Sequence, residues 1–158
     1  MTPQEIYSGF LKSEGEVLHL GCGDASLKTI LNPSKYIGVD LTEQADVKLD
    51  LNIKENYVRL PKDFDYVVLD KVLEEVDDPE ALIKYAGKLG TMIVVHEFKY
   101  DEDDYSHVQE HWKKPWSLRG LEGFLTDHYD WVNNYFLGYA TVHLCTTPNQ
   151  LLKEKNEN

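Results

Sequence analysis

Glycines and carboxylates follow the apolar runs of this sequence, and these residue types at strand ends are suited to holding a nucleotide. Gly21 and Gly23 come directly after the apolar stretch 17–20, where missing side chains let the backbone turn sharply and approach a ligand closely. Asp40 ends the next apolar run, where nucleotide-binding α/β units place a carboxylate that binds ribose hydroxyls. The stretch 16–40 therefore predicts a ligand that contains adenosine.

Further polar residues end the later apolar runs. Asp50 lies near the end of the alternating stretch 45–51, Asp70 follows the run 64–69, and His96 and Glu97 lie near the end of the run 91–98. Open α/β sheets bind ligands at the carboxyl ends of their strands. We interpret Asp70 and His96 as candidate catalytic groups that accept a proton or orient a substrate. A helix-capping role for Asp70 and a solvated strand end at Asp50 are the alternatives.

Metal and thiol chemistry find little support in the sequence. Glu97 beside Asp70 would form a carboxylate pair, but the ligand set is too small for a divalent ion, so we predict no metal site. The only two cysteines, Cys22 and Cys145, are far apart in the chain, which argues against a metal clip or a redox motif. Cys22 is best interpreted as a small buried hydrophobic residue.

The segment 99–116 has neither a helical nor a strand period and mixes acidic, aromatic and histidine residues. Segments of this length in a compact domain are usually lids or binding elements, or else disordered. Aromatic side chains beside histidines could cover an acceptor and exclude water. Alternatively, the tryptophans cap the core and the histidines are solvated. The candidate substrate contacts here are His107, His111, Trp112 and Trp116, with Lys71 and Glu97 at the strand ends.

The elements that must position these residues alternate between strand and helix patterns. Strands are expected at 16–21, 36–41, 45–51, 64–69 and 91–98, helices at 3–13, 25–31, 78–89 and from 117, and a hairpin at 131–139 and 141–146. Strands separated by helical patterns indicate βαβ units and a parallel sheet. The two final strands, joined at Gly138, predict an antiparallel hairpin.

Length and charge limit the function. The 158 residues fit one domain, which we place at 1–148 with a polar tail at 149–158. A net charge of −12 would repel a nucleic-acid backbone, so we expect a small-molecule substrate and no nucleic acid. No apolar run reaches the roughly 18 residues of a spanning helix, so we predict a soluble cytoplasmic protein without membrane contact. Tyr7, Tyr105 and the hairpin are candidates for a homodimer contact.

Taken together, these motifs resemble the class I S-adenosylmethionine-dependent methyltransferases over nearly the whole chain. The first strand of that family typically reads VLDIGCGTG, and this sequence reads VLHLGCGDA from Val17 to Ala25. The segment KVLEEVDDP from Lys71 to Pro79 is similar to the family's vLEHvxdP. The resemblance implies a Rossmann-like three-layer α/β sandwich, with a seven-stranded, mostly parallel sheet and an antiparallel C-terminal hairpin.

The resemblance also implies an activity and a set of contacts. The cofactor would be S-adenosyl-L-methionine, and the reaction a direct methyl displacement onto a small-molecule acceptor. Asp40 matches the acid on the ribose hydroxyls, and Asp50 with the amide of Leu51 matches the position that reads the adenine edge. The implied cofactor contacts are His19, Gly21, Cys22, Gly23, Asp40, Leu41, Asp50, Leu51 and Asp70.

Three positions differ from the family pattern and keep other functions open. His19 replaces the usual acid of the first strand, Ala25 replaces a third glycine, and Glu75 stands where many relatives have histidine. A cofactor-binding or protein-interaction module that has lost transfer activity is therefore the main alternative. A nicotinamide enzyme is a weaker one, since its GxGxxG fingerprint needs glycine at position 26, which is serine here.

Overall fold

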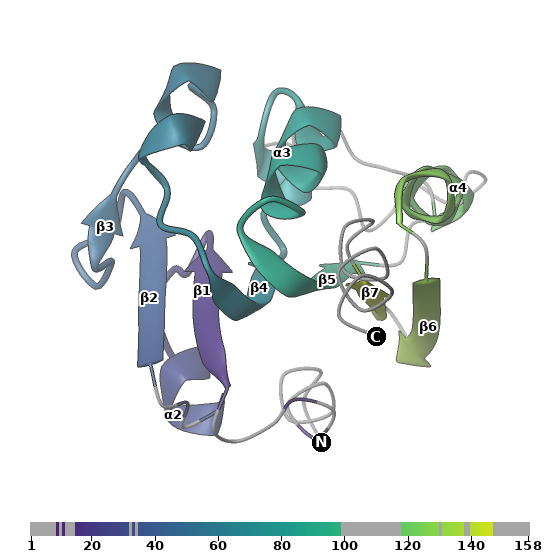
Figure 1. Cartoon of the computed structure of the whole chain (residues 1–158), viewed down its shortest axis with the longest axis horizontal. Helices are drawn as coiled ribbons and strands as arrows, with labels where there is room; N and C mark the ends of the chain where they lie inside the picture. The colour runs from purple at the N-terminus through teal and green to yellow at the C-terminus, as the bar shows by residue number, and fades with distance from the viewer. Residues whose placement is uncertain are drawn as a thin grey trace, which may run out of the picture.

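A computed structural model describes residues 15–31, 35–98, 118–129, 131–137 and 140–146, together with residues 9, 11 and 33. Its centre is one sheet of seven strands in the order β3-β2-β1-β4-β5-β7-β6 (Figure 1). The strands are β1 (Glu16–Leu20), β2 (Lys35–Asp40), β3 (Val47–Lys48), β4 (Phe64–Asp70), β5 (Gly90–Phe98), β6 (Trp131–Leu137) and β7 (Ala140–Thr146). The predicted helix 3–13, the segment 99–116 and the tail 149–158 lie largely or wholly outside the described residues.

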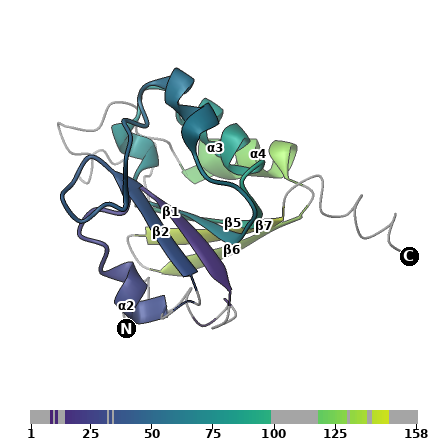
Figure 2. The ribbon, with the colours of Figure 1, turned by 60° about the vertical axis from the view of Figure 1, so that its left-hand side comes forward.

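Strands β1 to β5 pair in parallel, whereas β7 runs antiparallel to both β5 and β6. Helices α3 (Pro79–Ala86) and α4 (Leu118–His128) cover one face of the sheet, and α2 (Leu27–Leu31) lies on the other (Figure 2). The predicted three-layer α/β sandwich, with a mostly parallel sheet and an antiparallel terminal hairpin, is therefore confirmed. None of the described helices is long and apolar enough to cross a membrane.

Apolar residues fill both faces of the sheet, which explains why its central strands read as nearly continuous apolar runs. Leu18 and Leu20 of β1 belong to the core that packs against α3 and α4, while Val17 packs with Leu27 of α2 on the opposite face. The phenolic hydroxyl of Tyr129, just after α4, donates to the carbonyl of Ile83 in α3 at 2.6 Å. This bond holds the two helices of the larger layer together.

Some predicted boundaries were wrong. The strand predicted at 45–51 has only Val47 and Lys48, because β2 ends at Asp40 and offers no further partner, and the chain then turns into a 3₁₀ helix, η1 (Lys54–Arg59). Helix α2 starts later than predicted because Ala25 has a left-handed φ of 61°. Helix α3 ends at Ala86, before the predicted end at residue 89, and β5 begins at Gly90, one residue before the predicted start. A second 3₁₀ helix, η2 (Leu73–Glu75), was not predicted.

Candidate functional site

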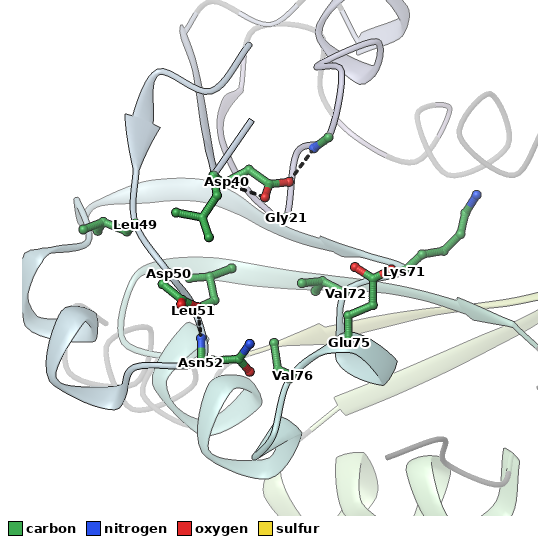
Figure 3. Close-up of a pocket in the computed structure, with 12 residues that line it drawn as sticks. Gly21, Asp40, Leu49, Asp50, Leu51, Asn52, Lys71, Val72, Glu75 and Val76 are labelled. Carbon is green, nitrogen blue, oxygen red and sulfur yellow. Dashed lines mark hydrogen bonds between the residues drawn. The ribbon is translucent and has the colours of Figure 1, made fainter. Parts of the chain in front are cut away.

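A cavity of about 310 Å³ opens where β1, β2 and β4 end (Figure 3). Its walls come from the turn after β1, the end of β2, the chain after β3, and the segment between β4 and α3. The lining residues are Gly21, Gly23, Asp40, Leu41, Leu49, Asp50, Leu51, Asn52, Lys71, Val72, Glu75 and Val76. The cavity therefore lies at the sheet edge where open α/β folds bind ligands.

The glycine turn folds tightly because two of its residues adopt left-handed backbone angles. Gly21 has a φ of 76° and Gly23 a φ of 54°, a region that side chains rarely tolerate. The amides of Gly21 and Cys22 both donate to the carbonyl of Val39, at 2.8 and 3.2 Å. A Cβ on Gly21 would lie 2.6 Å from Val72. Gly21 thus lets the turn pack directly against the opposite wall of the cavity.

Asp40 fixes the shape of that turn from the end of β2. One carboxylate oxygen accepts from the amide of Gly23 at 2.8 Å, and the other accepts from the amide of Leu41 at 2.7 Å. The hydroxyl of Thr42 donates to the carbonyl of Gly23 at 2.7 Å. Because a carboxylate offers about four acceptor positions, Asp40 retains capacity for hydroxyl groups of a ligand.

The chain after β3 forms the opposite end of the cavity. The carboxylate of Asp50 accepts from the amide of Asn52 at 2.9 Å, and the side-chain amide of Asn56 donates to the Asp50 carbonyl at 3.1 Å. Tyr57 is buried and donates from its hydroxyl to the carbonyl of Leu51 at 3.1 Å. These bonds hold a short non-strand segment in one conformation, so that Asp50 and Leu51 face the cavity.

The wall between β4 and α3 supplies both charge and apolar surface. Lys71 has a φ of 52°, and its amide donates to the carbonyl of His96 at 2.8 Å. The sharp turn there leads into η2, which carries Glu75 into the lining beside Val72 and Val76. Three carboxylates and one ammonium group line the cavity. Such a lining favours a ligand that carries positive charge.

Two hydrogen-bonded pairs lie on the face of the sheet that α2 covers, outside the cavity lining. Asp70 and His96 face each other at the ends of β4 and β5, with 2.7 Å between Oδ1 and Nδ1. On β1, His19 Nδ1 lies 2.7 Å from the hydroxyl of Tyr36. All four side chains are buried or nearly so: the His96 side chain is 1% exposed and that of Asp70 8%. This face of the sheet therefore buries two polar pairs among its apolar residues.

Burial determines how these groups ionise. It lowers the pKa of His19 to about 4, against a smaller opposing effect of the nearby carboxylates, of which Asp70 is the strongest. His19 is therefore neutral at pH 7, and its Nε2 is buried without a hydrogen-bond partner among the described residues. Burial and the charge of Asp40 raise the pKa of the Cys22 thiol to about 11, which fits the interpretation of Cys22 as an inert buried residue.

The structure brings together most, but not all, of the residues that the sequence singled out. Those that line the cavity are Gly21, Gly23, Asp40, Leu41, Asp50, Leu51 and Lys71. Those placed beside it are His19, Cys22, Asp70 and His96. The side chain of Glu97 is outside the described part, as are His107, His111, Trp112 and Trp116. Among described residues, no group of three potential metal ligands occurs.

Sequence reasoning assigned no role to five lining residues: Leu49, Asn52, Val72, Glu75 and Val76. The segment 71–79 resembles a family motif, but nothing in it predicts the 3₁₀ turn that brings Glu75 into the lining. Asn52 lies two residues beyond Asp50. An asparagine after a strand is typical of a turn, so the sequence at this position indicates a turn and no ligand contact. The contact of Asn52 with the far wall is a tertiary feature.

The fold has counterparts among solved structures. A scan against protein-family models and a search of curated protein sequences each found no match. Among solved structures, an O-methyltransferase family protein from Burkholderia thailandensis aligns with a TM-score of 0.69 at 13% identity over 92% of this chain and 55% of its own. This chain thus spans about half the length of that protein.

Two other structures align over most of both chains. A SAM-dependent methyltransferase from Archaeoglobus fulgidus has a TM-score of 0.69 at 16% identity, covering 91% of this chain and 94% of its own. Magnesium protoporphyrin IX methyltransferase from Synechocystis PCC 6803, solved with bound S-adenosylhomocysteine, has a TM-score of 0.67 at 13% identity, covering 91% and 81%. The chain has the class I methyltransferase fold.

Proposed function

We propose that this protein binds S-adenosyl-L-methionine in the cavity and transfers its methyl group to a small-molecule acceptor. The observation that carries the proposal is the meeting of the Gly21–Gly23 turn, Asp40 and Asp50 around one cavity at the sheet edge. A turn that admits close backbone approach suits the methionine part of the ligand, and the carboxylates at the end of β2 and in the chain after β3 suit its ribose and adenine parts. The fold is that of proteins whose solved examples carry S-adenosylhomocysteine.

The residues present suit the cofactor in capacity and in charge. Asp40 already accepts two backbone amides, and its remaining acceptor positions would take the ribose hydroxyls. Asp50 would accept from the adenine amine, and the net negative lining would attract the sulfonium. When bound, S-adenosylmethionine supplies an electrophilic methyl group on a positively charged sulfur. The chain contributes orientation and proximity.

The acceptor would bind near the ends of β4 and β5, beside Lys71. For a hydroxyl acceptor, the Asp70–His96 pair is the proposed proton acceptor: an Nδ1–H of His96 donating to Asp70 leaves the basic lone pair on Nε2. An amine or thiolate acceptor needs no such base. Five substrate contacts stay predictions: Glu97, His107, His111, Trp112 and Trp116. A cytoplasmic location and a homodimer also stay predictions.

A second candidate is a methyltransferase-fold module that binds the cofactor without transfer. The observation in its favour is His19, which stands at the position of the family's acid but is buried and neutral at pH 7. Such a residue cannot supply the negative charge of a carboxylate next to the cofactor. Ala25, in a left-handed conformation at the position of a third glycine, is a further difference within the same turn.

Calorimetric titration with S-adenosylmethionine, S-adenosylhomocysteine and NAD⁺ tests the proposal. We expect the two sulfur compounds to bind at one site and NAD⁺ not to compete. Binding should be followed by a turnover screen, in which mass spectrometry detects methylated products from phenol, carboxylate, amine and thiol acceptors. Absence of binding by both sulfur compounds would remove the enzyme proposal. Binding without turnover on any acceptor would favour the non-catalytic module.

A further inference from the structure

We propose that the acceptor is a hydroxycarboxylic acid, whose carboxylate binds Lys71 while its hydroxyl group is methylated. The inference rests on the proposed function, because it concerns the molecule that receives the methyl group, and it adds the chemical class of that molecule. Lys71 lines the cavity, and among the described residues that line it Lys71 is the one with a positively charged side chain.

The backbone holds Lys71 where β4 and β5 end. The amide of Lys71 donates to the carbonyl of His96 at 2.8 Å, and Lys71 directly follows Asp70 in the chain. Asp70 and His96 are partners in the strand register and are also joined through their side chains, with 2.7 Å between Oδ1 and Nδ1. Lys71 therefore leaves the sheet next to the pair that is proposed to accept the hydroxyl proton.

The conformation of Lys71 is unusual for its residue type. Its φ of 52° is left-handed, a region that a residue with a Cβ rarely occupies. Glycine or asparagine would adopt this turn more readily, so the turn alone does not account for a lysine at this position. Strained residues of this kind are concentrated at ligand sites. The side chain of Lys71 is therefore the feature that explains the residue type.

The side chain of Lys71 extends from a different part of the lining than the groups proposed to hold the nucleoside. Figure 3 shows its ammonium end directed away from Asp40 and Asp50. Lys71 is half-buried, so its ammonium group is partly removed from water, which strengthens its hydrogen bonds to an anion. This arrangement suits an anionic group of the acceptor.

Charge at short range selects the class of acceptor. The net charge of −12 repels an anion from a distance, but the screening length in physiological salt is about 8 Å, so a cation in the site itself decides at contact. The Lys71 ammonium attracts a carboxylate and repels an amine. Glu75 on the same wall would favour the amine, and the experiment below distinguishes the two.

A carboxylate at Lys71 brings the hydroxyl group of the same molecule to the Asp70–His96 pair. In the transfer, the hydroxyl proton passes to Nε2 of His96 while the hydroxyl oxygen bonds to the methyl carbon. The carbon–sulfur bond breaks and leaves its electron pair on sulfur. The products are a methyl ether that keeps its carboxylate, S-adenosylhomocysteine and a protonated His96.

The test uses three phenols that differ in charge: 4-hydroxybenzoate is anionic, 4-hydroxybenzamide neutral and 4-hydroxybenzylamine cationic. Calorimetry measures their binding to the full chain saturated with S-adenosylhomocysteine, and mass spectrometry detects their methylation with S-adenosylmethionine. A smaller aliphatic series consists of 3-hydroxypropionate, 3-hydroxypropionamide and 3-aminopropan-1-ol. In at least one series the wild type should bind the carboxylate at least about tenfold more tightly than the amide, and methylate its hydroxyl group.

Lys71→Met removes the charge and should lower the preference for the carboxylate about tenfold, while the affinity for S-adenosylhomocysteine changes by less than about twofold. Lys71→Arg retains the charge and should retain the preference. Lys71→Gln provides a second neutral variant should Lys71→Met fold poorly. Lys62→Met is the matched control, since it makes the same change at an exposed lysine outside the cavity lining. Thermal unfolding of each variant verifies the fold.

The outcomes separate this inference from the proposed function. A wild type that binds S-adenosylhomocysteine but prefers the carboxylate in neither series, whether it takes the amine or no compound at all, would overturn the inference and leave cofactor binding intact. An equal fall in Lys62→Met, or an equal loss of S-adenosylhomocysteine affinity in Lys71→Met, would do the same. A wild type that does not bind S-adenosylhomocysteine overturns both proposals. A preference that falls only in the neutral Lys71 variants supports the inference.

Discussion

Asp40 determines the geometry of the glycine turn and is also the residue proposed to bind ribose. Its two oxygens accept from the amides of Gly23 and Leu41, so the turn and the end of β2 are fixed by one side chain. A carboxylate held this way is oriented before any ligand arrives. The conformational entropy of this side chain is therefore lost when the protein folds and not when the ligand binds.

Asp40→Asn is predicted to weaken S-adenosylhomocysteine binding at least about tenfold. The asparagine amide has one acceptor oxygen in place of two, and the backbone amides of the turn still require that oxygen, so less acceptor capacity remains for the ligand. Titration calorimetry measures the change. Asp46→Asn is the control: Asp46 also accepts a backbone amide, that of Gly38 at 2.8 Å, but lies outside the cavity lining. An equal loss in both variants would mean that Asp40 acts only through the fold.

At the scale of elements, the site depends on how closely the turn after β1 approaches the chain after β4. Gly21 follows β1 and Val72 follows β4, and the two residues meet because these strands are paired from Val17 to Leu20. The unpredicted 3₁₀ turn η2 then carries Glu75 and Val76 to the same cavity. The contact between these two connections closes one side of the cavity.

Gly21→Ala should lower the free energy of unfolding by about 2 to 4 kcal/mol, since it adds both left-handed strain and a clash with Val72. Gly23→Ala is the matched control, because Gly23 is also left-handed but a Cβ there would meet nothing within 4 Å. It should cost about 1 kcal/mol, from strain alone. Urea unfolding measures both values.

A double variant tests the proposed cause. If the clash is with Val72, Val72→Ala should cost less in the Gly21→Ala background than in the wild type, because it makes room for the new methyl group. Strictly additive losses would show that Gly21 acts through backbone strain and not through its contact with the opposite wall.

At the scale of the whole molecule, covering both faces of the sheet buries two histidines, His19 and His143, in addition to His96. His19 faces the α2 side, and His143 of β7 lies on the side of α3 and α4, hydrogen-bonded to Asn134 at 2.6 Å between His143 Nδ1 and Asn134 Oδ1. Burial lowers the pKa of each to about 4, with a smaller contribution from His96 in the case of His143. Both are therefore neutral in the folded protein.

The lowered pKa values of His19 and His143 predict that the protein loses stability in acid. The unfolded chain takes up a proton on each below about pH 6.5, whereas the folded protein resists it until about pH 4. Stability is thus fully present above pH 6.5 and falls as the pH drops through this window, by up to about 3 kcal/mol for each histidine. Urea unfolding between pH 7 and pH 5 measures the slope.

His19→Gln and His143→Gln identify the source of that slope. Each replaces a titrating ring with a neutral amide, so each should reduce the pH dependence while lowering stability at pH 7. The carboxylates are the same in the wild type and in both variants, so they act as a common background. A slope that is unchanged in both variants would assign the acid sensitivity to other groups.

Much of the architecture followed from local patterns. The apolar runs around Leu18, Val67 and Ile93 predicted buried central strands because each carries enough apolar surface for both sheet faces. Asp78 and Pro79 marked the start of α3 through ordinary capping chemistry, and the Asp78 carboxylate does accept the amide of Ala81 at 3.1 Å. The start of α2 was misplaced because Ala25 adopts a left-handed conformation that its residue type does not favour. The start of β5 was misplaced because Gly90 pairs with Phe64 of β4, a long-range contact.

The sequence by itself determined the parallel sheet, the glycine turn and the acids at the strand ends, because periodicity and turn chemistry are local properties of the chain. Only the tertiary structure decided which of those residues share a cavity. Strand register placed His19 and His96 within a buried face and not in the lining, and a 3₁₀ turn added Glu75. The Asn52–Asp77 bond joins residues 25 positions apart, and no local pattern encodes such a contact.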